Sequence, residues 1–135
     1  MNCLSNMKKS AEEIEKHVVQ TLSAVGLSGF ELRCAHHLSG GEKKRASVAA
    51  VLACEPKILA LDEPWANLDA RASRAMTTIM CAFKGTLLVA SHDLSRAAAV
   101  CSRLIIIDNG TVVADGPMPE LLADAVLLEA HGLEL

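Results

Sequence analysis

The sequence predicts an α/β domain with a parallel sheet that is finished by an antiparallel edge hairpin. Two short apolar runs, residues 57–61 and 86–90, are separated by a helical pattern, which is typical of parallel strands joined by helices. An Asn-Gly pair lies between the runs 103–108 and 111–114, and this pair is the strongest short signal for a hairpin. The chain has 135 residues, 51% of them hydrophobic, which suffices for one core but not for two independent ones.

Two helices are expected before the first strand, and each begins with a capping box. Ser10–Glu13 is the first box, and apolar residues follow it at helical spacing until Gly26. Ser39–Glu42 is the second box, and its helix must end before Pro56. Residues 1–9 show no periodicity and are expected to fray.

Three more helices are expected in the rest of the chain. Asp69 can cap a helix between the two apolar strands, and residues 94–101 form a short helix after the second strand. Pro119 suits the first turn of a last helix, which reaches about His131 and is ended by Gly132. This order of elements fits strands joined by helices.

The composition excludes several classes of function. With 13 Lys and Arg residues against 16 Asp and Glu residues the net charge is −3, and only 2% of the residues are aromatic, so nucleic acid is not an expected partner. No apolar run approaches the roughly 20 residues of a membrane-spanning helix, and the N-terminal segment lacks the pattern of a secretory signal. Five cysteines without a C-x-x-C pair indicate free thiols in the cytosol.

The first candidate site is the glycine-rich start of the helix that follows Ser39. Gly40 and Gly41 let backbone N–H groups approach a ligand closely, and the helix dipole favours an anion at that end. The Ser39 hydroxyl could donate a hydrogen bond to the same anion. The alternative is an ordinary capped helix without a ligand, and these residues alone leave both possibilities open.

The second candidate site lies where the two apolar strands end, because α/β proteins bind ligands at that edge of the sheet. Asp62 could hold Mg²⁺, and Glu63 could orient or deprotonate a water molecule. His92 follows the second strand and could contact a phosphate. The alternatives are a polar turn and an exposed loop histidine, and residues 66–69 could be only a turn with an N-cap.

Four short segments occur in a fixed order: LSGGE at 38–42, ILALDE at 58–63, ANLD at 66–69 and SHD at 91–93. Together they resemble the second half of the ATPase domain of ABC transporters, from about residue 10 to the end of the chain. They are similar, in order, to the signature motif, the Walker B strand with the catalytic glutamate, the D-loop and the switch histidine. Three further segments look most like the cobalt/nickel branch of energy-coupling-factor importers: 36–45, 108–117 and 127–135.

The resemblance implies a partial P-loop NTPase-like domain that uses ATP and Mg²⁺. Residues 10–54 would form the helical and signature region, and residues 55–135 would carry Walker B, the D-loop, the switch histidine and the C-terminal tail. In this reading Asp62 would help to coordinate Mg²⁺ and Glu63 would polarise the hydrolytic water. His92 would sense the γ-phosphate.

The resemblance also implies nucleotide sites that are shared between two ATPase chains. The signature residues would close over ATP held by a second ATPase subunit or a Walker A-bearing half: Ser39, Gly40, Gly41 and Glu42. The D-loop residues would couple the two halves of the dimer: Ala66, Asn67, Leu68 and Asp69. Membrane transport subunits would hold the chain at the cytoplasmic face of the cell membrane, where hydrolysis would drive import of an ion such as cobalt or nickel.

The chain departs from the family in several respects. These 135 residues contain no G-x-x-x-x-G-K-[ST] segment, so the Walker A half is missing from them. We therefore expect this chain alone neither to bind ATP tightly nor to hydrolyse it. We also expect strands 57–62 and 86–90 to leave an unpaired edge and exposed apolar surface, which favours self-association. Glu42 replaces a frequent glutamine, and Trp65 replaces a small hydroxyl residue. The indole is expected beside the dimer contact, where it could impede closure or add a stacking contact.

Three other functions are compatible with parts of the sequence. A non-catalytic, split or degenerate module could complete a partner ATPase, and the missing Walker A segment favours this reading. A DNA-repair type of ABC ATPase head needs a long coiled coil before the signature, but only 38 residues precede Ser39 and none show heptads. A metal site at Cys34, His36 and His37 would lack a second pair of ligands.

Overall fold

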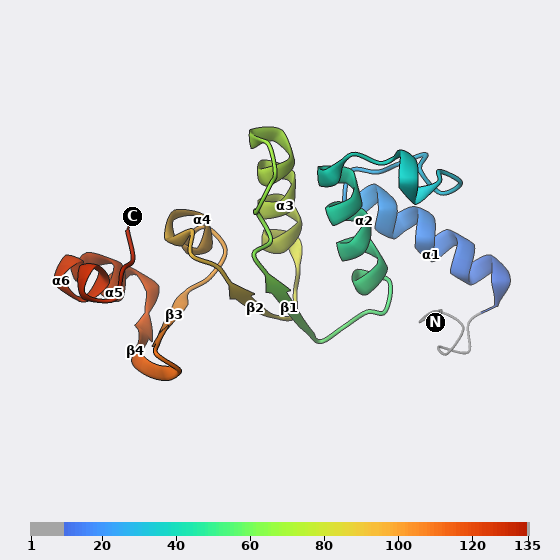
Figure 1. Ribbon diagram of the computed structural model, residues 1–135. Coiled ribbons are helices and arrows are strands. Elements are labelled where there is room, and N and C mark those ends of the chain that lie inside the picture. The colour runs from blue at the N-terminus through green and yellow to red at the C-terminus, as the bar shows by residue number, and fades with distance from the viewer. Residues whose placement is uncertain (1–9, 135) are drawn as a thin grey trace. The chain divides into compact units, whose positions relative to one another are not determined.

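The computed structural model describes residues 10–134, so the fraying expected for residues 1–9 lies outside the described residues. The chain divides into two compact units. The first unit comprises the chain up to residue 59 together with 64–88, and the second comprises 60–63 together with the chain from residue 89. Helices and strands alternate, which confirms the α/β class (Figure 1). Within the described residues, no helix is both long and apolar enough to span a membrane.

The helices of the first unit begin where the sequence predicts. They are α1 (Ala11–Ala24), α2 (Gly40–Leu52) and α3 (Ala70–Ala82), capped by Ser10, Ser39 and Asp69. Both predicted capping boxes are present, since each serine and the glutamate three residues later accept a hydrogen bond from the other's backbone. A short 3₁₀ turn, η2 (Ala35–His37), is an element that the periodicity does not predict.

Helices α1 and α2 lie side by side, and two polar side chains join them (Figure 1). His17 Nε2 lies 2.9 Å from the carbonyl oxygen of Ala53, and the Arg45 guanidinium donates to the carbonyl oxygen of Val25 at 3.1 Å. These carbonyls belong to helix ends, where the helix itself supplies no partner. The buried apolar side chains of this unit include Val25, Leu27, Val48, Leu59, Trp65, Met76 and Met80.

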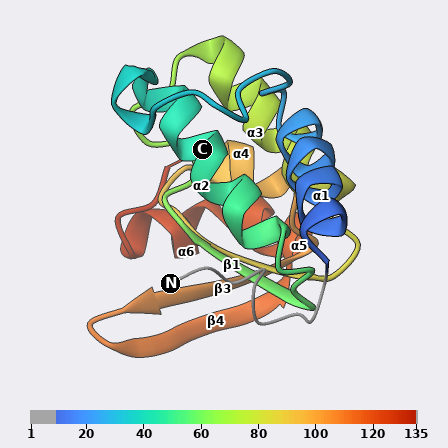
Figure 2. The ribbon, with the colours of Figure 1, turned by 90° about the vertical axis from the view of Figure 1, so that its right-hand side faces the viewer.

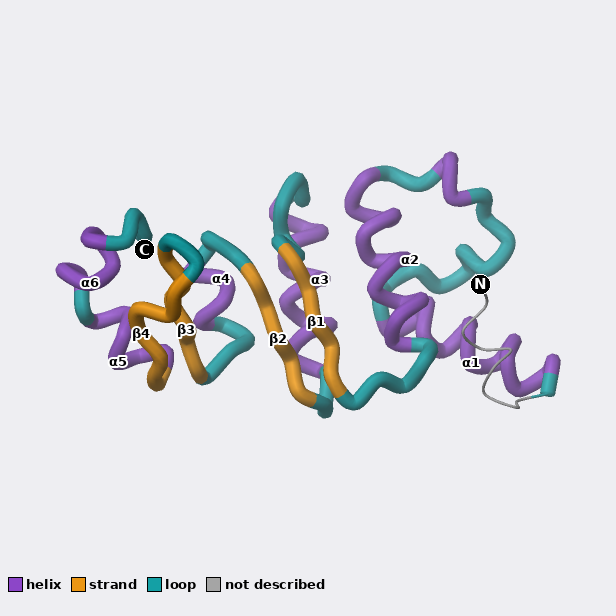
Figure 3. The backbone as a smooth tube through the Cα atoms, turned by 60° about the horizontal axis from the view of Figure 1, so that its bottom comes forward, coloured by secondary structure: helices purple, strands orange, loops and turns teal. Residues whose placement is uncertain are grey.

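The strands β1 (Ile58–Asp62) and β2 (Thr86–Ala90) pair with each other (Figure 3). Near the start of both strands Thr86 N donates to Lys57 O at 2.8 Å, and near their ends Glu63 N donates to Ala90 O at 2.9 Å. The two strands therefore run in the same direction, as the sequence predicts.

The prediction that both strands are buried is wrong. Ile58 in β1 is 65% exposed and Leu88 in β2 is 59% exposed. Because side chains alternate between the two faces of a strand, only one face of each strand is covered in the described residues. The expected exposed apolar surface is therefore present.

The second unit carries a hairpin that packs against short helices (Figure 2). Strands β3 (Arg103–Asp108) and β4 (Thr111–Pro117) pair antiparallel around Asn109 and Gly110, whose φ angles of 48° and 76° suit a hairpin turn. We predicted one continuous sheet, but in the described part of the chain the hairpin is a separate two-stranded sheet. The reason is that its inner face packs locally, with Ile106 against the buried Leu94 and Leu128.

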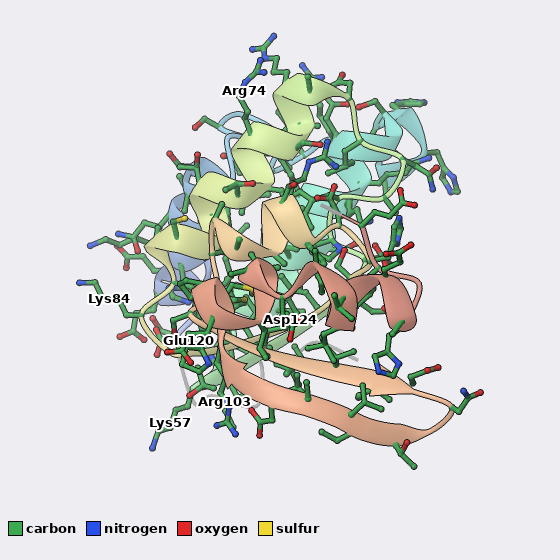
Figure 4. All side chains as sticks on the ribbon, turned by 90° about the vertical axis from the view of Figure 1, so that its left-hand side faces the viewer. Lys57, Arg74, Lys84, Arg103, Glu120 and Asp124 are labelled. Carbon is green, nitrogen blue, oxygen red and sulfur yellow. The ribbon has the colours of Figure 1, made fainter. Side chains whose placement is uncertain are left out.

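The helices of the second unit are α4 (Leu94–Ala98), α5 (Met118–Ala123) and α6 (Ala125–Ala130). The sequence predicts α5 and α6 as one helix, which is wrong because Asp124 leaves the helical region with φ −90° and ψ 81°. Asp124 then caps α6 by accepting from the Leu127 backbone at 3.0 Å (Figure 4). Pro119 lies in the first turn of α5, as predicted.

Candidate active site

The chain turns sharply at Glu63, directly after β1. The φ angle of Glu63 is +41°, a left-handed conformation that is uncommon for residues other than glycine. Its backbone N–H donates to Ala90 O at 2.9 Å, so the pairing with β2 continues through this residue. Such a conformation persists where the surrounding structure holds it. The end of β2 therefore provides the fixed edge that positions Glu63.

Two residues that follow β2 hold the Glu63 carboxylate. The Ser91 hydroxyl donates to Oε2 at 3.0 Å, and the His92 backbone N–H donates to Oε1 at 3.0 Å. The ring nitrogen Nδ1 of His92 lies 2.7 Å from the same Oε1. The structure thus brings Glu63 and His92 into direct contact. It also adds Ser91, which the sequence prediction omitted although this serine stands beside His92 in the SHD segment.

These contacts set the charge of Glu63. Burial alone would raise its pKa, but the hydrogen bonds from the His92 ring, the His92 backbone and Ser91 outweigh burial and lower the pKa below the ordinary 4.5. Glu63 is therefore ionised at neutral pH. The His92 side chain is 82% exposed, and because Nδ1 meets Glu63, Nε2 is the ring nitrogen that an incoming group can reach.

Asp62, the predicted Mg²⁺ ligand, is the exposed last residue of β1. Within residues 10–134, no three His, Cys, Asp or Glu side chains lie close enough to hold a metal ion together. A single carboxylate still fits Mg²⁺, which proteins usually hold with one or two carboxylates while phosphate oxygens and water complete the shell. The alternative metal site at Cys34, His36 and His37 gains no support, and all three residues are exposed.

At the start of α2, Ser39 and Glu42 satisfy each other. Ser39 Oγ accepts from Glu42 N at 3.3 Å, and Glu42 Oε2 accepts from Ser39 N at 2.8 Å. Hydrogen bonds from Ser39 lower the pKa of Glu42, and the bond from the Ser39 backbone has a larger effect than the bond from its hydroxyl. A carboxylate therefore already lies at the helix tip where the sequence predicts an anion.

The two glycines of the helix tip have different surroundings. A Cβ at Gly40 would meet nothing within 4 Å, so this backbone is open to a ligand. A Cβ at Gly41 would lie 3.0 Å from Ala72 Cβ and 3.6 Å from Leu68 Cδ2. The geometry at Gly40 fits the expected approach of a ligand, whereas Gly41 lets α2 pack closely on the start of α3.

The segment from Ala66 to Asp69 is a turn that leads into α3. Asn67 has a φ angle of +59°, which reverses the chain direction within the segment. Asp69 accepts from the Ala72 backbone N–H at 2.7 Å, so the predicted N-cap is confirmed.

Trp65 does not lie at the surface. It is 2% exposed, and its indole Nε1 donates to Thr77 Oγ1 on α3 at 3.1 Å. The expectation of an indole beside the dimer contact is wrong, because the ring is buried in the core of the first unit and satisfied there. Trp65 instead anchors the turn that follows it.

Residues 1–66 match a protein-family model described as ABC transporter. A Gloeobacter violaceus protein, provisionally named as an ABC transporter ATP-binding protein, is 49% identical over 132 residues, which cover 96% of this chain and 54% of that protein. The energy-coupling factor transporter ATP-binding protein EcfA of Methanothermobacter thermautotrophicus is 35% identical over 133 residues, which cover 96% of this chain and 43% of EcfA.

Among solved structures, CbiO1 from Clostridium perfringens, part of the ABC transporter complex CbiONQ, is similar with a TM-score of 0.75 and 31% identity. The similarity covers 94% of this chain and 52% of CbiO1, so this chain spans about half the length of the proteins it matches. The observed helices and strands agree with this fold. The chain therefore matches the ATP-binding domain of ABC transporters in both sequence and fold.

Proposed function

We propose that this chain carries the signature, Walker B, D-loop and switch-histidine elements of an ATP-hydrolysing importer subunit. The observation that carries the proposal is the Glu63 carboxylate, which Ser91 and His92 hold just beyond two parallel strands. The names of EcfA and CbiO1 support an importer of the energy-coupling-factor type. We also propose a metal ion such as cobalt or nickel as its cargo and membrane transport subunits as its partners at the cytoplasmic face.

Glu63 would act on the attacking water. A carboxylate with a lowered pKa is a weak proton acceptor at neutral pH, so its main contribution would be to orient the water and to stabilise positive charge that develops on it. Ser91 and His92 would keep both carboxylate oxygens in place.

Asp62 and His92 would act on either side of this carboxylate. Asp62 would hold Mg²⁺ directly or through water, and bound Mg²⁺ neutralises charge on the transferred phosphoryl group. His92 would contact the γ-phosphate through Nε2, because its Nδ1 already meets Glu63.

The helix tip would serve a nucleotide on a second chain. The Ser39 hydroxyl would donate to a phosphate oxygen, and the open Gly40 backbone would allow close approach. Glu42 opposes an anion at the same tip because its carboxylate lies on the Ser39 backbone. This tip should therefore hold a phosphate less firmly than one with glutamine at this position.

The proposal is tested by adding a separately produced chain that carries a Walker A half and measuring phosphate release. We expect no release from this chain alone and ATP-dependent release from the mixture. Glu63→Gln should slow that release by about 10²- to 10⁴-fold, because an amide orients and polarises the water poorly. Glu12→Gln, on the exposed first turn of α1, is the matched control and should have no effect.

A different result would favour the second candidate function. If the mixture hydrolyses ATP and Glu63→Gln leaves the rate unchanged, this chain completes a partner ATPase without supplying its catalytic carboxylate.

A further inference from the structure

We propose that Lys44 is a positioning residue that ties the signature motif (38–42) to the D-loop (66–69), so that both elements move as one body. Both are expected to reach a second ATPase chain, so this inference rests on the proposed function. The sequence alone gives Lys44 no such role, because the basic run 43–45 is most simply a solvated helix face.

The first contact is made by the Lys44 side chain. Its Nζ donates to the carbonyl oxygen of Ala66 at 3.2 Å, and the contact is partly buried. Its neighbour Lys43 is exposed. The Lys44 side chain therefore turns to the first residue of the D-loop, while the side chain of the preceding residue, Lys43, faces solvent.

The second contact is the close packing of Gly41, one turn earlier on α2. A Cβ added to Gly41 would lie 3.0 Å from Ala72 Cβ and 3.6 Å from Leu68 Cδ2. Leu68 belongs to the D-loop and Ala72 to the first turn of α3, so α2 meets both. The Ala72 backbone also donates to Asp69 at 2.7 Å. The residue that meets Gly41 thus also fixes the end of the D-loop.

The D-loop is anchored on its other side by the buried Trp65. The Leu68 backbone N–H donates to Trp65 O at 3.2 Å, which closes the turn. The Lys44–Ala66 hydrogen bond and the Gly41 contact therefore both link α2 to the D-loop. Loss of Lys44 would remove the first of these links and leave the packing at Gly41.

Three variants of the whole chain test the Lys44 contact by amide hydrogen exchange. Lys44→Met removes the donor, Lys44→Arg retains one, and Lys43→Met makes the same charge change on the exposed neighbour. We expect the Leu68 amide to exchange about tenfold faster in Lys44→Met, and at the wild-type rate in the other two. An unchanged Leu68 amide in Lys44→Met would overturn the proposal.

A glycine pair tests the packing contact separately. Gly41→Ala and Gly40→Ala add the same methyl group and the same gain in helix propensity, but only Gly41→Ala places the methyl against Leu68 and Ala72. We expect faster exchange at Leu68 in Gly41→Ala and not in Gly40→Ala. Equal behaviour of the two variants would contradict the second contact.

The ATPase completed with a Walker A half distinguishes this proposal from the proposed function. Lys44→Met should lower kcat by roughly 2- to 30-fold with KM for ATP unchanged, because Lys44 acts through the D-loop. Lys44→Arg should restore the rate. If the wild-type mixture releases no phosphate, the proposed function fails while the exchange data still decide the coupling. If Leu68 exchange rises but kcat does not fall, the contact is only structural and the positioning role is refuted.

Discussion

The helix tip at Ser39 and the strand end at Glu63 both place a carboxylate against a serine, but they draw on different lengths of chain. Glu42 accepts from Ser39 N, three residues before it, at 2.8 Å. Glu63 accepts from Ser91 and His92, which lie 28 and 29 residues further along. The first arrangement needs only its own helix. The second needs the strand pairing and the packing that holds the start of α4.

The largest expected effect comes from a core change beneath the assembled site. Leu94 follows His92 closely, is 3% exposed and belongs to the buried cluster with Ile106 and Leu128. Leu94→Ala should lower the free energy of unfolding by about 2–5 kcal/mol, through lost burial and the cavity left behind. NMR titration should show the Glu63 pKa rising toward 4.5 and the Glu42 pKa unchanged.

Val126→Ala is the matched control for Leu94→Ala. Val126 is 79% exposed, so this change should alter the free energy of unfolding by no more than about 0.5 kcal/mol. If Leu94→Ala moved the pKa of Glu42 as far as that of Glu63, the distinction between a local and an assembled site would be wrong.

A smaller effect is expected from removing the local cap. Ser39→Ala should lower the free energy of unfolding by about 0.5–2 kcal/mol in urea titrations, because the first turn of α2 loses its N-cap. The pKa of Glu42 should rise, since Ser39 Oγ no longer contacts it, while the pKa of Glu63 stays in place. Ser102→Ala, on an exposed residue, is the control. Equal stability of the Ser39 and Ser102 variants would show that the capping box contributes nothing.

The same contrast explains which parts of the fold the sequence predicts. Helix starts at Ser10, Ser39 and Asp69 are predictable because a cap involves residues only three positions apart. Asp124 carries the same signal, but helix-forming residues on both sides of it favour one unbroken helix. The strands are predictable from their apolar runs, but their burial is not, because it depends on what covers each face.

In the candidate site, too, some features are predictable from the sequence and others depend on contacts between distant segments. Proximity of Glu63 and His92 is predictable because both follow parallel strands that end at one edge. The contacts of Ser91 with Glu63 and of Lys44 with Ala66 are not, because they depend on how far a side chain reaches between segments 22 to 28 residues apart. The position of the Trp65 side chain is not predictable for a similar reason, since its partner Thr77 lies on the next helix.

The smallest expected effect is on the pH dependence of stability. The folded-state pKa of Glu63 lies below 4.5, so the unfolded chain binds this proton more readily than the folded chain does. Glu63 therefore stabilises the fold above pH 4.5, and this contribution is lost as the pH falls through the folded-state pKa. Urea unfolding should be measured as the pH is lowered from 4.5. Over this range the free energy of unfolding should fall less steeply in Glu63→Gln than in the wild-type chain.

Glu42→Gln gives the local counterpart of that measurement. The Glu42 pKa is also lowered, so the sign of the effect is the same. Its carboxylate is held by an exposed hydrogen bond at the helix tip and by the charges of Arg45 and Arg33, so added salt should reduce its contribution more than that of Glu63. At low salt both variants should flatten the curve, and at high salt the flattening by Glu63→Gln should persist. If salt removed both effects equally, the hydrogen bonds from Ser91 and His92 would contribute no more to holding the Glu63 carboxylate than a surface charge does.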